Sequence, residues 1–110
     1  MWQSARLLVK SVYEYVRKGA FGREFELRDQ VKRAALSVMT NLAEGFERGS
    51  NKDFVRFLFI AKASCGEVRS LIYVAEDQDF MKEDTAKTLR QQCFELSSQI
   101  GGFIKYLEKN

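Results

Sequence analysis

The chain has 110 residues, of which 45% are hydrophobic and 30% are charged, a balance typical of a single globular domain over residues 1–110. It contains no proline, which argues against a turn-rich β fold. No apolar run approaches the roughly 18 to 20 residues of a membrane span. The N-terminus lacks the order of charged and apolar segments found in a signal peptide. These features predict a cytoplasmic protein with a helical fold and no membrane partner.

The net charge of +3 is unevenly distributed along the chain. Residues 1–62 hold twelve Lys and Arg against seven Asp and Glu, whereas residues 63–110 hold six against eight. There is no histidine, and the two cysteines, Cys65 and Cys93, are far apart in the sequence. We therefore expect no metal site and no cofactor. We interpret both cysteines as buried free thiols.

Four segments show the helical periodicity of apolar residues. The first, about residues 4–18, is expected to end at Gly19 in a left-handed cap. The second covers about residues 25–47, the third about residues 51–75 and the fourth about residues 83–107. Apolar residues repeat every three or four positions, which is the pattern of a bundle seam. The seam of the third segment is predicted to contain Phe54, Phe57, Ala61, Ser64, Val68, Leu71 and Ala75.

The turn between the second and third segments carries the clearest local signals. Gly49 suits a left-handed C-terminal cap and Ser50 an N-cap, while Asp53 occupies the third helical position, where a carboxylate can return the hydrogen bond. So short a link makes the two helices antiparallel neighbours. The start of the fourth helix lacks a Ser or Thr cap, because Lys82 stands there. The predicted fold is an all-α, antiparallel, up-down-up-down four-helix bundle.

A ladder of polar side chains flanks the apolar face of the second helix. Most of them fall within about 40° of one line on a helical wheel, and two polar residues of the third helix lie along an edge of its seam. One interpretation is a solvated flank. The other is a hydrogen-bonded network between helices that sets register or assembly. The candidate network consists of Gln30, Arg33, Ser37, Asn41 and Glu44 on the second helix with Ser64 and Glu67 on the third.

Six apolar residues fall outside the four seams, namely Leu36, Met39, Val55, Phe59, Tyr73 and Phe94. Single exposed apolar residues are normal on a protein surface. This many on a small bundle predicts a surface that another chain covers. The candidate oligomer-interface residues are Leu36, Met39 and Phe59.

Residues 27–68, LRDQVKRAALSVMTNLAEGFERGSNKDFVRFLFIAKASCGEV, resemble the signature of the four-helix-bundle proteins related to those encoded in intervening sequences of bacterial 23S ribosomal-RNA genes. The family pattern combines a Leu-Arg-x-Gln start, an Ala-Glu-Gly end, a Ser cap, a Phe-Leu-x-Ile-Ala run and a Ser-x-x-Glu pair. The matching positions are Leu27, Arg28, Gln30, Arg33, Ala34, Ala35, Ser37, Asn41, Ala43, Glu44, Gly45, Ser50, Phe54, Phe57, Leu58, Ile60, Ala61, Ser64 and Glu67.

The chain departs from the family pattern at three positions. Met39 stands where the family has a mid-helix proline, Gly22 where a proline often follows the position of Phe21, and Lys82 where Ser or Thr is usual. The resemblance implies a cytoplasmic bundle that assembles as a ring-like homopentamer. The biochemical role of the family is poorly defined. Its genomic setting suggests ribosomal RNA, and the bundle is similar to an accessory protein of diversity-generating retroelements that binds nucleic acid and a reverse transcriptase.

Binding of RNA or DNA through a basic surface is the first functional hypothesis. Arg28, Lys32, Lys52 and Arg56 are expected to cluster around the hairpin of the second and third helices, although such a cluster can also be a solvated charged face. Five copies at +3 would carry about +15, and a ring of Lys and Arg could hold a polyanion through phosphate contacts with little sequence preference.

A structural or adaptor oligomer that binds a protein partner is the alternative hypothesis, and it depends on the exposed apolar residues and the polar ladder. Enzymatic activity is the hypothesis with the least support. The chain has no histidine to serve as a general base, no imidazole to activate its cysteines, and no glycine-rich phosphate loop. We therefore predict a protein without catalytic residues.

Overall fold

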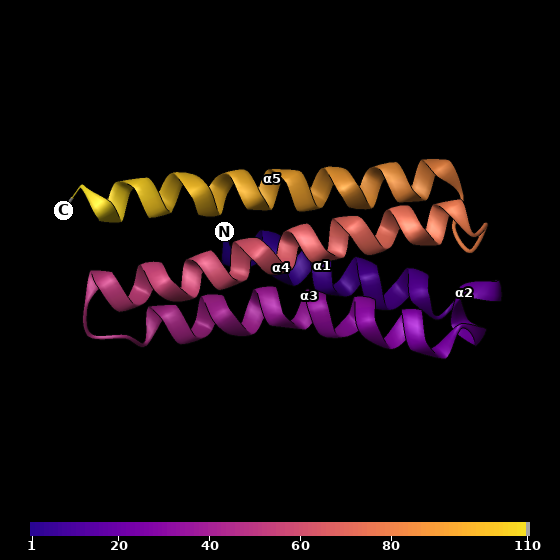
Figure 1. The fold of residues 1–110 in the computed structure, drawn as a ribbon, viewed down its shortest axis with the longest axis horizontal. Helices are drawn as coiled ribbons and strands as arrows, with labels where there is room; N and C mark the ends of the chain where they lie inside the picture. Colours follow the sequence, from indigo (N-terminus) through magenta and orange to yellow (C-terminus); the bar gives the residue numbers. More distant parts are fainter. Residues whose placement is uncertain (110) are drawn as a thin grey trace.

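The structure is a computed structural model in which residues 1–109 are described, and within that range it is all-helical, which confirms the predicted fold class. Each of four long helices runs antiparallel to the long helix before it, and a short fifth helix links the first two of them (Figure 1). The bundle is elongated, with principal dimensions of 47 × 20 × 19 Å. The helices are α1 (Trp2–Val16), α2 (Gly19–Arg23), α3 (Phe25–Phe46), α4 (Asn51–Asp77) and α5 (Glu83–Glu108).

The first helix is much shorter than its neighbours. Helix α1 has 15 residues, whereas α3, α4 and α5 have 22, 27 and 26. The N-terminus lies near the middle of the long axis, and α1 runs from there toward α2 (Figure 1). Within residues 1–109, one half of the bundle therefore contains α1, α3, α4 and α5 side by side, whereas the other half contains α3, α4 and α5 without α1. We call the second half, which contains the α3–α4 turn and the C-terminal end of α5, the open half.

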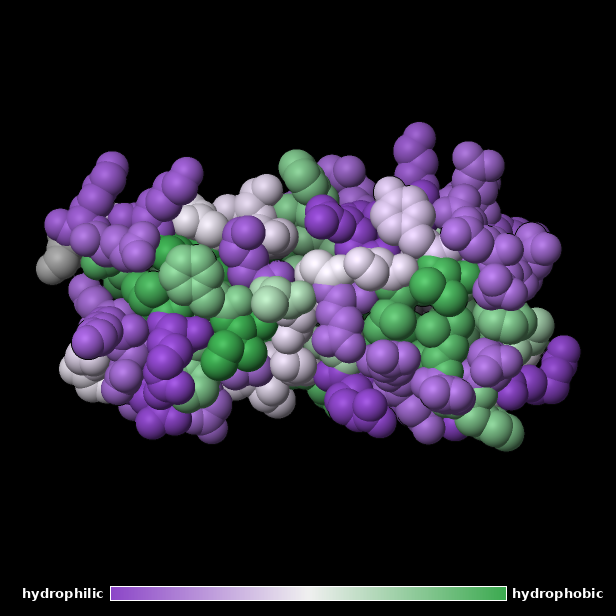
Figure 2. All heavy atoms as spheres, in the orientation of Figure 1, coloured by the Kyte–Doolittle hydropathy of each residue, from purple (hydrophilic) through white to green (hydrophobic). Residues whose placement is uncertain are grey.

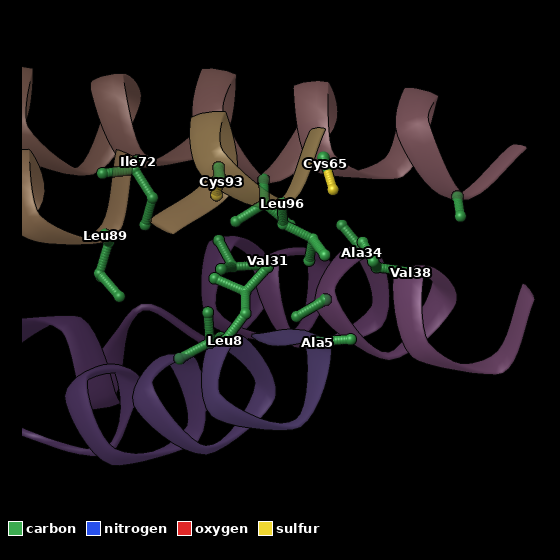
Figure 3. Packing of buried hydrophobic residues seen from close by; sticks show 14 of the residues in the cluster. Ala5, Leu8, Val31, Ala34, Val38, Cys65, Ile72, Leu89, Cys93 and Leu96 are labelled. Carbon is green, nitrogen blue, oxygen red and sulfur yellow. The ribbon is translucent and has the colours of Figure 1, made fainter. Parts of the chain in front are cut away.

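The core runs along the interior of the bundle and is formed by buried aliphatic residues from all four long helices. In Figure 3, Leu8 of α1, Val31 of α3, Ile72 of α4 and Leu89 of α5 point toward one another. All four are fully buried. Burial of apolar area is the main source of stability for such a bundle, so these side chains fix how the four helices pack.

The buried face of α4 differs from the predicted seam. Phe54, Phe57 and Leu71 belong to the predicted seam but are only half-buried. Leu58 and Ile72, each one position further along the helix than Phe57 and Leu71, are fully buried instead. Helix α4 packs against both α3 and α5, so its buried face is wider than a narrow 3-4 seam. The residues of α4 that are buried are Leu58, Ala61, Ser64, Cys65, Val68, Ile72 and Ala75.

The chain between α1 and α3 forms an unpredicted helix. Helix α1 ends at Val16, earlier than expected, and Gly19 begins the five-residue helix α2. Gly19 does have the left-handed φ of +54° that the prediction required of it, but it lies two residues beyond the C-cap residue Arg17. A turn of helix this short carries no readable periodicity, which is why the sequence pattern did not indicate it.

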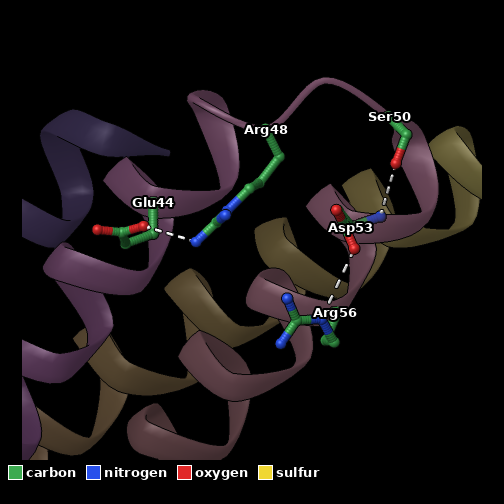
Figure 4. Close-up of polar contacts among 5 residues, drawn as sticks. All are labelled: Glu44, Arg48, Ser50, Asp53 and Arg56. Carbon is green, nitrogen blue, oxygen red and sulfur yellow. Dashed lines mark hydrogen bonds and ion pairs between the residues drawn. The ribbon is translucent and has the colours of Figure 1, made fainter.

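The α3–α4 turn is partly as predicted. Ser50 is the N-cap of α4, and its Oγ accepts a hydrogen bond from the backbone N–H of Asp53 at 3.2 Å (Figure 4). The Asp53 carboxylate lies 3.8 Å from the Arg56 guanidinium and makes no return bond to Ser50. Gly49 does not adopt a positive φ, so the expected left-handed cap was wrong; the turn closes instead through backbone bonds to Glu44 and Gly45.

The surface combines charged side chains with apolar areas. Figure 2 shows hydrophobic atoms reaching the surface near both ends of one face, surrounded by hydrophilic side chains. Within residues 1–109, no helix combines the length and the apolar composition that crossing a bilayer requires.

Candidate functional site

Three members of the polar ladder form a hydrogen-bonded cluster between α3 and α4. Ser37 Oγ and Ser64 Oγ are 2.8 Å apart, which links the two helices. The Asn41 side-chain amide donates to the Ser37 carbonyl oxygen at 2.8 Å and to Ser37 Oγ at 3.1 Å. Ser64 is buried, and Ser37 and Asn41 are half-buried. Because each of these side chains has a polar partner, the cluster can occupy the helix interface without an unsatisfied hydroxyl.

The other members of the ladder lie outside this cluster. Glu44 is exposed and accepts a hydrogen bond from Arg48 at 3.0 Å, one turn along the same helix (Figure 4). Gln30, Arg33 and Glu67 are exposed, and their side chains form no hydrogen bond or ion pair with any described residue. The structure therefore brings together only the residues of the ladder that lie closest to the α3–α4 contact.

Replacing Asn41 with leucine is expected to lower the thermal midpoint while the helix content is retained. The change removes both amide hydrogen bonds and leaves the Ser37 carbonyl without its side-chain donor, at a cost of about 1–3 kcal/mol. Thermal unfolding followed by circular dichroism measures this, with Gln30→Leu as the control because Gln30 is exposed. Sedimentation would show whether the cluster also affects assembly. An unchanged midpoint with an unchanged sedimentation profile would contradict any role for this cluster.

The four predicted nucleic-acid residues do not form one cluster. Arg28 and Lys32 lie near the start of α3, whereas Lys52 and Arg56 lie near the start of α4. The start of α4 is next to the end of α3, and Lys32 lies fourteen residues before that end, so the two pairs are separated by roughly 20 Å along the bundle. These four residues therefore form two separate pairs of cations, and not the single basic cluster that was expected around the hairpin.

Three of these four cations already have partners within the chain. Arg28 donates to the Gly22 carbonyl oxygen at 3.1 Å and lies 3.1 Å from the Asp29 carboxylate. The Lys32 ammonium lies 4.7 Å from the centre of the Tyr13 ring. Arg56 pairs with Asp53. Side chains held in this way are less available to an external phosphate.

A groove that the sequence analysis did not identify lies between α4 and α5. It has a volume of about 590 Å³ and is open to solvent. Lys62 and Arg69 line it from α4, two helical turns apart. We call it the α4–α5 groove. Its lining residues are Lys62, Arg69, Phe94, Ser97, Ser98, Gly101, Gly102 and Lys105.

All the charged residues that line the α4–α5 groove are basic. None of its lining residues is acidic. Lys62, Arg69 and Lys105 form neither a hydrogen bond nor an ion pair with another side chain in the part of the chain that the structure describes. Three cations without a counter-charge, in a concave surface, favour the binding of an anion. This arrangement depends on the register between α4 and α5. The spacing of residues along either helix does not determine that register.

The residues of α5 that line the α4–α5 groove are mostly small and include two adjacent glycines, Gly101 and Gly102. A Cβ added at Gly102 would meet no atom within 4 Å, and one at Gly101 would lie 3.4 Å from the Lys62 side chain. Ser97 and Ser98 are also small. A ligand backbone can therefore approach α5 closely at this point.

A second surface feature is a row of aromatic rings in the open half. The rings of Phe46 and Phe54 have centroids 4.9 Å apart, those of Phe54 and Phe103 lie 5.3 Å apart, and those of Phe103 and Tyr106 lie 5.9 Å apart. Phe46 and Tyr106 are exposed, whereas the two middle rings are half-buried. This aromatic strip crosses α3, α4 and α5, where α1 does not extend.

The candidate interface residues have different environments. Leu36 and Phe59 are 39% and 52% exposed. Met39 is half-buried against the core and lines a hollow beside α1, together with Leu7 and Val9. Leu36 and Phe59 therefore remain available to another chain, while Met39 mainly contributes to packing within the bundle.

The two cysteines are buried and are not joined by a disulfide. Burial raises the pKa of the Cys65 thiol from its ordinary 9.0 to about 12, although the charges of Lys62 and Arg69 lower it slightly. Burial also raises the pKa of Cys93 to about 12, and the proximity of Cys65 adds to that effect. Because the thiolate is the reactive form, both side chains are poor nucleophiles near neutral pH.

The folded protein is therefore expected to react slowly with a disulfide reagent at pH 8, and the unfolded chain quickly. Between pH 9 and 12 the unfolded chain ionises its thiols before the folded protein does, so stability should fall as the pH rises through this range. Thiol labelling with and without denaturant measures the first effect, and urea titrations at several pH values measure the second. Rapid labelling of the folded protein would contradict the buried placement.

The fold and the groove define a small all-α bundle with a basic groove between two of its helices. Residues 1–102 match the family described as 23S rRNA-intervening sequence protein, and the chain belongs to this family. No curated protein matches the chain.

Comparison with solved structures supports the same fold. The chain is similar to a protein of unknown function from the S23 ribosomal protein family of Bacteroides thetaiotaomicron, whose crystal structure is known at 1.70 Å resolution. The TM-score is 0.87 with 17% sequence identity, and the match covers 94% of this chain and 97% of that chain. At this identity the likeness establishes the bundle architecture.

Proposed function

We propose that the protein is a non-enzymatic, oligomeric helical bundle that binds RNA or other nucleic acid through a basic surface, without sequence specificity. The observation that carries this proposal is the α4–α5 groove, in which Lys62, Arg69 and Lys105 have no counter-charge among the described residues. Phosphate contacts made by such cations supply affinity but do not read the base sequence. The description of the family makes ribosomal RNA the first ligand to test.

Assembly into a homopentamer, which the family resemblance implies, would strengthen this binding. Each copy would contribute one α4–α5 groove, so a long polyanion could contact several grooves at once. Linked contacts of this kind raise the apparent affinity without any new type of contact. Sedimentation equilibrium of the purified protein tests the assembly independently of nucleic acid.

The test of the proposed function is fluorescence anisotropy with nucleic-acid-free protein and a labelled ribosomal-RNA fragment at several salt concentrations. We expect micromolar or tighter binding that weakens steeply as salt increases, because counterions are released from the phosphates. An unrelated RNA of equal length serves as the control and should bind with similar affinity. Absence of binding at low salt would overturn the proposal.

The aromatic strip supports a second candidate function, that of an adaptor for a protein partner. An exposed apolar surface of this kind can receive the apolar face of a helix from another chain. If RNA binding fails, Phe46→Ser, Leu36→Ser and Phe59→Ser become the informative variants. The adaptor function expects at least one of them to abolish association with a defined partner, whereas charge changes at Arg28 and Lys32 should have no effect.

A further inference from the structure

Phe94 is the one aromatic side chain in the α4–α5 groove, and its ring is exposed. It is 55% exposed and packs against no other ring or cation among the described residues. Along α5, it shares a face with Ser98 and Lys105, which follow it by one turn and by three turns. The groove therefore presents an apolar ring at one end and an ammonium group at the other.

The dimensions of the groove suit a short stretch of nucleic acid. Phe94 and Lys105 are eleven residues apart, or about 16 Å along α5. That distance equals roughly five stacked nucleotides at 3.4 Å each. Lys62 and Arg69 line the same groove from α4, so cations border this path on both helices.

A duplex and a single strand would use these side chains differently. Both present phosphates to Lys62, Arg69 and Lys105. A duplex keeps its bases stacked inside, so it offers no base face to Phe94, whereas a single strand has bases that can stack on an aromatic ring. Only a single strand satisfies both the cations and the exposed ring.

We infer that the α4–α5 groove selects single-stranded nucleic acid, with phosphates on Lys62, Arg69 and Lys105 and one base stacked on Phe94. This inference rests on the proposed function and names the form of nucleic acid that the groove takes. The small residues that line the groove on α5, Gly101 and Gly102 among them, leave space for the strand.

The test compares an unstructured 12-nucleotide RNA strand with a 12-base-pair RNA duplex at one salt concentration, by fluorescence anisotropy. The variant is Phe94→Ala, and the matched control is Phe25→Ala, because both rings are more than half exposed and Phe25 lies on α3, outside the groove and outside the candidate oligomer interface. Phe94→Ala should weaken binding of the strand by about 5- to 150-fold, the range for loss of one base–aromatic stack. Binding of the duplex should not change, and Phe94→Trp should retain binding of the strand.

Each outcome decides the matter. Weaker binding of the strand with Phe94→Ala, together with unchanged duplex binding, supports the inference. An unchanged affinity for the strand, or an equal loss for strand and duplex, overturns the inference while the proposed function stands. Failure of the wild-type protein to bind either probe at low salt overturns the proposed function as well. Circular dichroism of the variants establishes that each is folded.

Discussion

Replacing Leu58 with alanine is expected to lower the free energy of unfolding by about 2–5 kcal/mol, the range for truncating a fully buried leucine. Leu58 has no exposed surface and lies on α4, which packs against both α3 and α5. Removing its side chain leaves a cavity that the two neighbouring helices can close only in part. Urea unfolding followed by circular dichroism gives the change in free energy.

The control for this experiment is Leu7→Ala, the same substitution at a leucine of α1 that is 53% exposed. Its expected effect is within about 0.5 kcal/mol. The comparison also tests the corrected face of α4, because the sequence pattern had placed Phe57 in the seam and left Leu58 out. A cost at Leu58 no larger than that at Leu7 would contradict the observed packing.

Replacing Lys62, Arg69 and Lys105 together with glutamine is expected to weaken RNA binding by about 10- to 100-fold at low salt. Each phosphate contact to a single strand contributes about 0.7 to the dependence of log affinity on log salt, so the slope should decrease by about 2. Glutamine has a helix propensity close to that of lysine and arginine, so the fold should be retained. Anisotropy titrations at several salt concentrations measure both quantities.

The matched control replaces Arg28, Lys32 and Arg56 with glutamine, which removes the same amount of charge. These three cations have partners within the chain, so their loss should reduce affinity much less than the loss of the groove cations. A larger effect in the control would show that the positions predicted from sequence form the nucleic-acid interface and that the α4–α5 groove does not.

The helical fold could be predicted from the sequence because periodicity and capping are local signals. Ser50, for example, is the N-cap of α4, as its position three residues before Asp53 predicts. The buried face of α4 was harder to predict, since periodicity reports the average direction of the apolar face and not the number of helices packed on it. Leu58 and Ile72, which the predicted seam omits, are fully buried because α4 packs against both α3 and α5.

The candidate site could be predicted only in part, for a related reason. Ser37 and Ser64 lie on the facing sides of two helices joined by a short turn, so their contact followed from local signals. The α4–α5 groove combines Arg69 with Phe94, and nothing in the sequence fixes the register that places them together. Arg28 and Arg56 do not belong to one cluster because Arg28 lies eighteen residues before the end of α3, far from the α3–α4 turn, whereas Arg56 lies close to that turn.

The short first helix gives the molecule two ends with different protection from solvent. Where α1 is present, α3 and α5 pack against both α1 and α4; in the open half, which α1 does not reach, α4 is the helix that they both contact. Local opening requires less free energy where fewer packed contacts must be broken. Amide hydrogens near the α3–α4 turn should therefore exchange with deuterium sooner than those near α2, so the open half would be the first part of the bundle to loosen.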